Sequence, residues 1–466
     1  MSSPSFPQEI FDQIVDSVAS GRDRKALFSL NLTSQRHFLH RSRSRIFYTV
    51  TIAGNIPSLL SLFEGTESLG EHVQRIVLDL TFNAVLAYIR TQRKAQYRLT
   101  CLMDRFPNAR LLHLIGDGTA HDDLHPTCIA VINKLMAYPL ARLLSICHIP
   151  DLPASILESL SNLHTLELGE GVNLVHVGGD EVRNQTGPWC LQILRCESKG
   201  IIALPGLNSH YPPSTHRGLR VIVIQEIEFP ARHTAAWSFI IEVSKVAALE
   251  VISLTYTDFK IDLAFGFSII KCFKAKSFTL PSIPTLRFLR IKVFHKGGRG
   301  SLNSYLELSS FLPLFPLVLL QGAPQPSLEV VDLVYACSTS EYGAGSGARF
   351  TVDHYDYFSS VRRDYRDWAA LDDVLSDKIN FPRLQALRIS SKYRYYHEDN
   401  SDQTNTTVKE IADKWGLETL AAMPKSAERI PLVDVGVDTR VTKRFKEASR
   451  WAKDLIRRDG DEAWSN

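Results

Sequence analysis

A six-residue pattern, apolar-x-x-apolar-x-apolar, recurs from residue 73 onward and constrains the fold more than any other feature of the chain. Alternating apolar side chains predict a short strand with one buried face. A single strand of this kind cannot enclose a core, so neighbouring copies must stack and bury one another. The copies begin at Val73, Ala109, Ala141, Leu163, Leu191, Leu219, Leu249, Leu286, Leu328 and Leu384, with a weaker one at Ile430. We therefore predict a repeat array over residues 73–439.

The spacing of the copies is irregular. The shortest interval runs from residue 141 to residue 163, and the longest from residue 328 to residue 384. The longest one predicts an insertion at about residues 336–383. Near the end of this insertion, Trp368, Leu371, Leu375 and Ile379 follow at helical intervals. We expect them to form a helix that packs on the array.

The first fifty residues predict three short helices. In the first helix, Phe6, Ile10, Ile14 and Val18 share one face, and Pro7 lies where a first helical turn tolerates proline. Two further apolar sets, in residues 26–32 and 38–47, predict the second and third helices. A core this small usually needs a partner or a neighbouring domain to complete its burial.

These N-terminal residues resemble an F-box. The family pattern is Leu-Pro-x-Glu-Ile, a helix, a leucine-rich segment that ends in Ser-Arg-x-Phe or Trp, then Leu-Phe and a short strand. The chain has FPQEI at residues 6–10, a loose TSQRHF at 33–38 and RSRIFYTV at 43–50, with Phe6 in place of the leucine. The Trp-x-x-Leu-Asp segment at 368–372, ahead of Phe-Pro-x-Leu at 381–384, is similar to fungal F-box proteins with irregular leucine-rich repeats.

The resemblance implies a non-enzymatic recognition subunit of a cullin-based, SCF-type ubiquitin ligase. The N-terminal helices would bind the Skp-type adaptor, and the repeats would hold a protein substrate while other subunits transfer ubiquitin. No cofactor is implied. The apolar adaptor-binding residues would be Phe6, Pro7, Ile10, Ile14, Leu27, Leu30 and Phe38.

We accordingly predict an α+β chain with four parts. A three-helix F-box-like bundle (residues 1–50) is followed by a linker helix (51–72), centred on residues 57–63. An irregular α/β leucine-rich-repeat solenoid (73–439) comes next, and a C-terminal amphipathic capping helix (440–466) ends the chain. The apolar face of that last helix consists of Val441, Phe445, Ala448, Ala452 and Leu455.

Composition and motifs argue against other classes of protein. The net charge of +3 gives no general affinity for nucleic acid. The seven cysteines form no CxxC pair, so neither a disulfide framework nor a zinc site is indicated. No apolar run approaches the ~20 residues that span a bilayer. We predict no metal, no nucleic-acid partner and no membrane partner, and a cytoplasmic or nuclear location.

Two other functions stay open. In one, the chain is a leucine-rich-repeat scaffold unconnected to any ubiquitin ligase, and its N-terminal helices only cap the array. In the other, it is an enzyme with dispersed active-site residues, although the sequence contains no GxSxG, HExxH or Walker motif. No motif encodes the substrate.

Overall fold

The computed structural model describes residues 8–20, 24–33, 38–53, 56–64, 67–81, 95–118, 130–135, 137–138, 140–150, 152–153, 163–172, 174–175, 191–197, 217–228, 233–257, 279–297, 314–339, 365–395, 417–437 and 443–452. The chain divides into two compact units, and the division falls between Gln192 and Ile193. This division does not coincide with the domain boundaries expected at residues 50, 72 and 439, which stay predictions.

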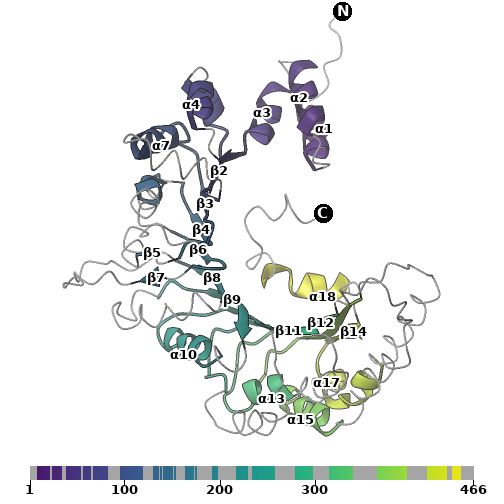
Figure 1. The fold of residues 1–466 in the computed structure, drawn as a ribbon. Coiled ribbons are helices and arrows are strands. Elements are labelled where there is room, and N and C mark those ends of the chain that lie inside the picture. Colours follow the sequence, from purple (N-terminus) through teal and green to yellow (C-terminus); the bar gives the residue numbers. More distant parts are fainter. Residues whose placement is uncertain are drawn as a thin grey trace, which may run out of the picture. The chain divides into compact units, whose positions relative to one another are not determined.

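The first unit begins with three helices, α1 (Gln8–Ser20), α2 (Arg24–Thr33) and α3 (Leu39–Ile46), in the region where three were expected (Figure 1). Two more helices follow after a short strand: α4 (Ile56–Glu64) and α5 (Glu67–Gly70). The α4 helix occupies the predicted linker. Its Ile56 and Phe63 side chains are fully buried, and the Phe63 ring contacts Phe106 edge to face at 4.9 Å. The linker helix is therefore part of the core of this unit.

Parallel strands make up the rest of the first unit. In sequence order, β1 (Thr49–Ile52), β2 (Arg75–Asp79), β3 (Leu111–Ile115), β4 (Leu143–Cys147) and β6 (Thr165–Leu168) each pair with the next. The α7 helix (Ala95–Met103) lies between β2 and β3 in the sequence. A separate small ladder joins β5 (Leu152–Pro153) to β7 (Leu174–Val175).

The second unit continues the same plan with longer strands. Its strands are β8 (Ile193–Glu197), β9 (Val221–Glu228), β10 (Val251–Thr257), β11 (Phe288–Gly297), β12 (Val330–Thr339), β13 (Ala386–Tyr395) and β14 (Leu432–Val437). They too are parallel and paired in sequence order. Its helices are α10 (His233–Ser244), α13 (Leu314–Leu320), α15 (Tyr365–Leu375), α17 (Pro424–Arg429) and α18 (Lys443–Ala448).

The strand register confirms the repeat pattern. Within each unit, the central apolar residue of a copy lies beside that of the next copy: in the second unit, Ile222 pairs with Ile252, Ile252 with Leu289, and Leu289 with Val331. Both inward-facing residues of the ten strong copies are buried. Every copy therefore forms one strand of a parallel sheet, as a solenoid-like repeat requires.

The β1 strand follows the same rule one step earlier. Phe47, Val50 and Ile52 have the spacing of the repeat, and Val50 and Ile52 pair with Ile76 and Leu78 of β2. This strand coincides with the short strand that ends the F-box pattern. The parallel sheet of the first unit therefore starts before residue 73, where the sequence array was expected to begin.

One expectation about the insertion is wrong. Trp368, Leu371 and Leu375 are buried on α15 as expected, but Ile379 is exposed. The helix ends at Leu375, and the Asp377 carboxylate then accepts hydrogen bonds from the backbone N–H groups of residues 379 and 380. This turn directs Ile379 away from the helical face that its spacing suggested.

Two general features of the described residues bear on function. None of their helices combines the length and the apolar character that crossing a bilayer would require. Their histidine, cysteine and acidic side chains form no group of three or more that could hold a metal ion.

Candidate functional site

The three N-terminal helices share a small apolar core. Val15 of α1, Leu27 of α2 and Phe38, the residue before α3, are buried together. The ring of Phe11 packs edge to face on Phe38, with 5.1 Å between the ring centroids. Aromatic pairs in this geometry stabilise a core by about 0.5–1.5 kcal/mol beyond the burial of their area. One residue from each part of the bundle thus fixes the positions of the helices.

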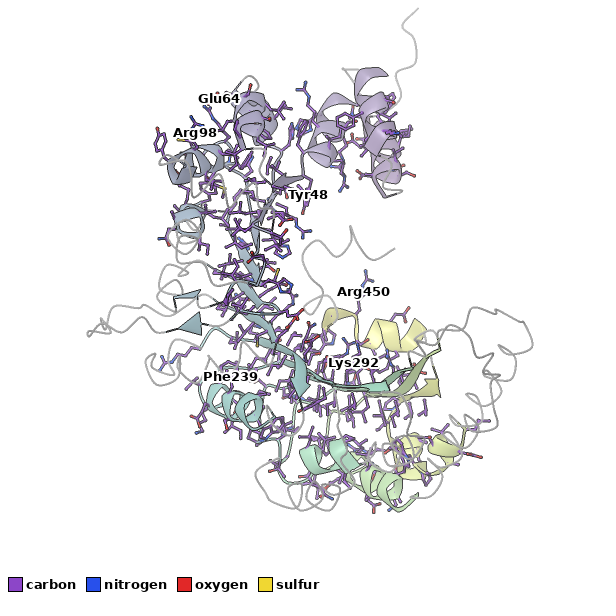
Figure 2. The ribbon with its side chains drawn as sticks, in the orientation of Figure 1. Tyr48, Glu64, Arg98, Phe239, Lys292 and Arg450 are labelled. Atoms are coloured by element: carbon purple, nitrogen blue, oxygen red, sulfur yellow. The ribbon has the colours of Figure 1, made fainter. Side chains whose placement is uncertain are left out.

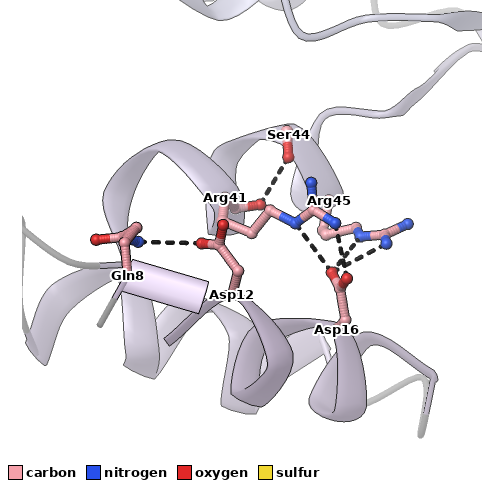
Figure 3. Close-up of polar contacts among 6 residues, drawn as sticks. All are labelled: Gln8, Asp12, Asp16, Arg41, Ser44 and Arg45. Atoms are coloured by element: carbon pink, nitrogen blue, oxygen red, sulfur yellow. Dashed lines mark hydrogen bonds and ion pairs between the residues drawn. The ribbon is translucent and has the colours of Figure 1, made fainter. Parts of the chain in front are cut away.

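A charge cluster joins α1 to α3 on the outside of this core (Figure 3). Asp16 accepts two hydrogen bonds from the Arg41 guanidinium, at 3.0 and 2.7 Å, and one from Arg45 at 2.9 Å. These hydrogen bonds, chiefly those from Arg41, lower the pKa of Asp16. Part of the basic run in this segment therefore pairs within the bundle.

Two of the predicted adaptor-binding residues face outward. Ile10 and Ile14 lie one turn apart on α1, and each is 41% exposed. Leu30 of α2 is half-buried and packs against the bundle core. The pair lies beside the stripe of Phe11 and Val15 that packs in the bundle, and it leaves apolar surface open to water.

The other predicted residues lie elsewhere. Leu27 and Phe38 are buried in the bundle core, where they hold the helices together and present little surface to a partner. Phe6 and Pro7 lie outside the described residues. The adaptor-binding role of all seven residues stays a prediction. Among those described, the structure distinguishes the residues exposed to solvent from the residues buried in the bundle core.

A further exposed apolar residue was missing from the predicted set. The Phe28 side chain on α2 is 49% exposed. The sequence contained a signal for it: Phe28 directly follows the core residue Leu27, so it projects about 100° around the helix from the buried side. This position lies beside the apolar stripe of α2 and not on it, so the Phe28 ring remains at the surface.

Among the described residues of the second unit, a hollow lined by charged side chains could suggest an enzyme. It lies between α15 and the residues around α17, and Asp372, Asp373, Glu418 and Lys425 are among its lining residues. The buried Asp372 carboxylate, however, accepts hydrogen bonds from the backbone N–H groups of Lys425 and Ser426 at 3.0 and 2.6 Å. Asp373 pairs with the Lys425 ammonium at 2.5 Å. These carboxylates hold α17 against α15, which is a structural role.

Comparisons with known proteins add little to this picture. No family model matches the sequence, and no curated protein matches it either. Among solved structures, the chain is similar to one chain in the crystal structure of the Rad7 and Elc1 complex in yeast. The similarity covers 86% of this chain and 93% of that chain, at 12% sequence identity and a TM-score of 0.30. Values this low establish neither a common fold nor a common function.

Proposed function

We propose that this chain is the substrate-recognition subunit of a cullin-based, SCF-type ubiquitin ligase. Its N-terminal helices bind the Skp-type adaptor, and its parallel repeat array holds a protein substrate. The chain itself performs no covalent step. The observation that carries this proposal is the outward-facing apolar pair Ile10 and Ile14, on a bundle whose sequence resembles an F-box and which precedes a repeat array.

The bundle is closed by residues other than the exposed isoleucine pair, which supports a docking role for that pair. Val15, Leu27 and Phe38 already supply an internal core, and Asp16 with its two arginines fixes α1 to α3. The isoleucine pair is therefore not needed to close the bundle. Burying it against a partner gains roughly 25 cal/mol for each Å² of apolar surface removed from water.

The experiment is a binding assay between the purified full chain and a purified Skp-type adaptor. The test variant is the double substitution Ile10→Glu with Ile14→Glu. We expect it to keep the circular dichroism spectrum of the wild type and to lose adaptor affinity by at least about thirtyfold. That loss corresponds to about 2 kcal/mol, the level of an interface hot spot.

A matched control comes from α4. Leu62 is 43% exposed, almost the same as the two isoleucines, but it lies outside the three-helix bundle. Leu62→Glu makes the same chemical change and should leave adaptor binding intact. A folded wild-type chain that ignores the adaptor would instead leave a repeat scaffold with a helical cap, and the proposed ligase function would be wrong.

A further inference from the structure

The first unit brings a thiol and an imidazole together on adjacent strands. Cys147 is the last residue of β4, and its Sγ atom lies 3.4 Å from Nε2 of His113 on β3. The thiol also lies 3.6 Å from the backbone carbonyl oxygen of Leu114. Both side chains of the pair are half-buried, so the sulfur is within reach of small molecules in the solvent.

The strand register explains why the two side chains meet. Ser145 of β4 pairs with His113, so Cys147 is the diagonal neighbour of His113 on the next strand. Side chains project from both faces of these strands (Figure 2), and every second residue along a strand shares a face. His113 and Cys147 therefore lie on the same face. Two paired strands, and not a loop, hold the thiol beside the imidazole.

The pair provides what a reactive cysteine needs. The thiolate, and not the thiol, attacks electrophiles. A neighbouring imidazole takes up the thiol proton, and the imidazolium N–H then donates a charge-assisted hydrogen bond to the thiolate. While the proton is on the sulfur, the thiol donates to the Leu114 carbonyl oxygen. Transfer of the proton to His113 therefore replaces a weak hydrogen bond by an ion pair.

Acidic residues flank the pair on the same face and act in opposite directions. Asp79 of β2 is the diagonal neighbour of His113, and its negative charge favours the protonated imidazolium. Glu167 of β6 is the diagonal neighbour of Cys147, and its negative charge opposes the thiolate. Of these groups, the imidazole alone accepts a proton near neutral pH and then carries the positive charge that the thiolate requires. His113 therefore decides the reactivity of Cys147.

Two other cysteines among the described residues lack this combination. Cys196 is buried, and burial raises the pKa of its thiol, so it stays protonated. Cys101 of α7 is half-buried like Cys147, but its side chain forms a hydrogen bond with Tyr97. The two residues are internal references for the reactivity of an inaccessible thiol and of an accessible thiol beside a phenol.

We propose that Cys147 is a redox-sensitive modification site, which hydrogen peroxide oxidises to a sulfenic acid with His113 as the proton carrier. The thiolate sulfur attacks one peroxide oxygen, so that an S–O bond forms and the O–O bond breaks. The sulfur is oxidised by two electrons and the peroxide is reduced. The leaving hydroxide takes the proton from the imidazolium and departs as water. This site does not depend on adaptor binding or on the proposed ligase function.

The first test is the alkylation rate of each cysteine in the reduced full chain, measured with iodoacetamide and mass spectrometry. At pH 7 we expect Cys147 to react at least about tenfold faster than Cys101. Cys196 should stay unmodified, which also shows that the chain is folded. Between pH 8.5 and pH 6.5 the rate of an ordinary thiol falls about fiftyfold, whereas that of Cys147 should fall less than about tenfold.

Variants assign this behaviour to the imidazole. His113→Gln removes the proton acceptor and keeps a polar side chain, so its Cys147 should react at least about tenfold more slowly at pH 7. The same variant should show the fall of about fiftyfold between pH 8.5 and pH 6.5. His164→Gln is the matched control, because that imidazole bonds to Thr165 and Gln192, and it should leave the rate of Cys147 unchanged.

The second test treats the wild type with hydrogen peroxide and then with dimedone, which traps sulfenic acids. We expect a dimedone adduct on Cys147 at least about tenfold more abundant than on Cys101, and its loss in His113→Gln. Alkylation of Cys147 at the rate and with the pH dependence of Cys101 would overturn the inference. The wild type alone gives this result, even where a variant does not fold. Fast alkylation without a dimedone adduct would equally overturn it, because the thiol would then be reactive without being a site of peroxide oxidation.

Discussion

At the scale of single residues, Asp16 fixes two helices of the N-terminal bundle. Its ion pairs with Arg41 and Arg45, at 2.7 and 2.9 Å, are partly open to water, which screens them. Asp16→Asn should therefore lower the free energy of unfolding by only about 0.5–1 kcal/mol. Denaturant unfolding of the full chain measures this. Asp12→Asn is the comparison, because its carboxylate accepts a hydrogen bond from Gln8 within α1 and acts on Arg41 only through its charge. An effect as large as that of Asp16→Asn would contradict the cross-helix role of the Asp16 hydrogen bonds.

His72 predicts how stability depends on pH. Burial lowers its pKa below the ordinary value of 6.5, and the charge of nearby His40 adds to this effect. The folded state therefore takes up this proton less readily than the unfolded chain. The protonation of His72 should not affect stability above about pH 6.5. Below that pH, it should lower stability progressively, until the pH passes the lowered pKa of His72 in the folded state. Between about pH 7.5 and about pH 5.5, wild type should lose more stability than His72→Gln, and equal losses would contradict the prediction.

At the scale of elements, the strands of the second unit are joined by side chains as well as by backbone. Asp332 on β12 is buried between Arg290 on β11 and Arg388 on β13, and Arg388 is itself buried. Asp332→Ala leaves a buried cation without its partner and should cost about 3–5 kcal/mol. Glu250→Ala breaks the more exposed pair with Arg220 on the same sheet and should cost less than about 1 kcal/mol. Denaturant unfolding compares the two, and similar losses would show that burial does not decide the strength of these pairs.

Sequence reasoning identified these elements better than it identified their orientation. The apolar spacing located the repeat strands because alternate burial is a local rule along each strand. On α1, however, two apolar stripes lie next to each other: Ile10 with Ile14, and Phe11 with Val15. Only packing against Leu27 and Phe38 decides that the second stripe faces the core. Likewise, the sequence predicted an apolar face for the C-terminal helix but contained no information about which surface receives it.

At the scale of the whole molecule, we expect a destabilising substitution to act first on the unit that contains it. In a repeat array each strand is stabilised mainly by its neighbours. A destabilising substitution therefore weakens the adjacent strands before it unfolds the whole chain. Leu112 on β3 and Leu289 on β11 occupy equivalent buried positions of the repeat in different units. Truncating either leucine to alanine should cost about 2–5 kcal/mol, since it removes buried methyl groups and leaves a cavity.

Hydrogen exchange of the full chain shows where that cost appears. Leu112→Ala should accelerate amide exchange first in β2–β4, and Leu289→Ala first in β10–β12, each by at least tenfold relative to the strands of the other unit. The two variants act as controls for each other, because the chemical change and the depth of burial are the same. Equal acceleration in all strands by either substitution would mean that the whole chain unfolds as one cooperative body, and the division at residue 192 would then have no energetic meaning.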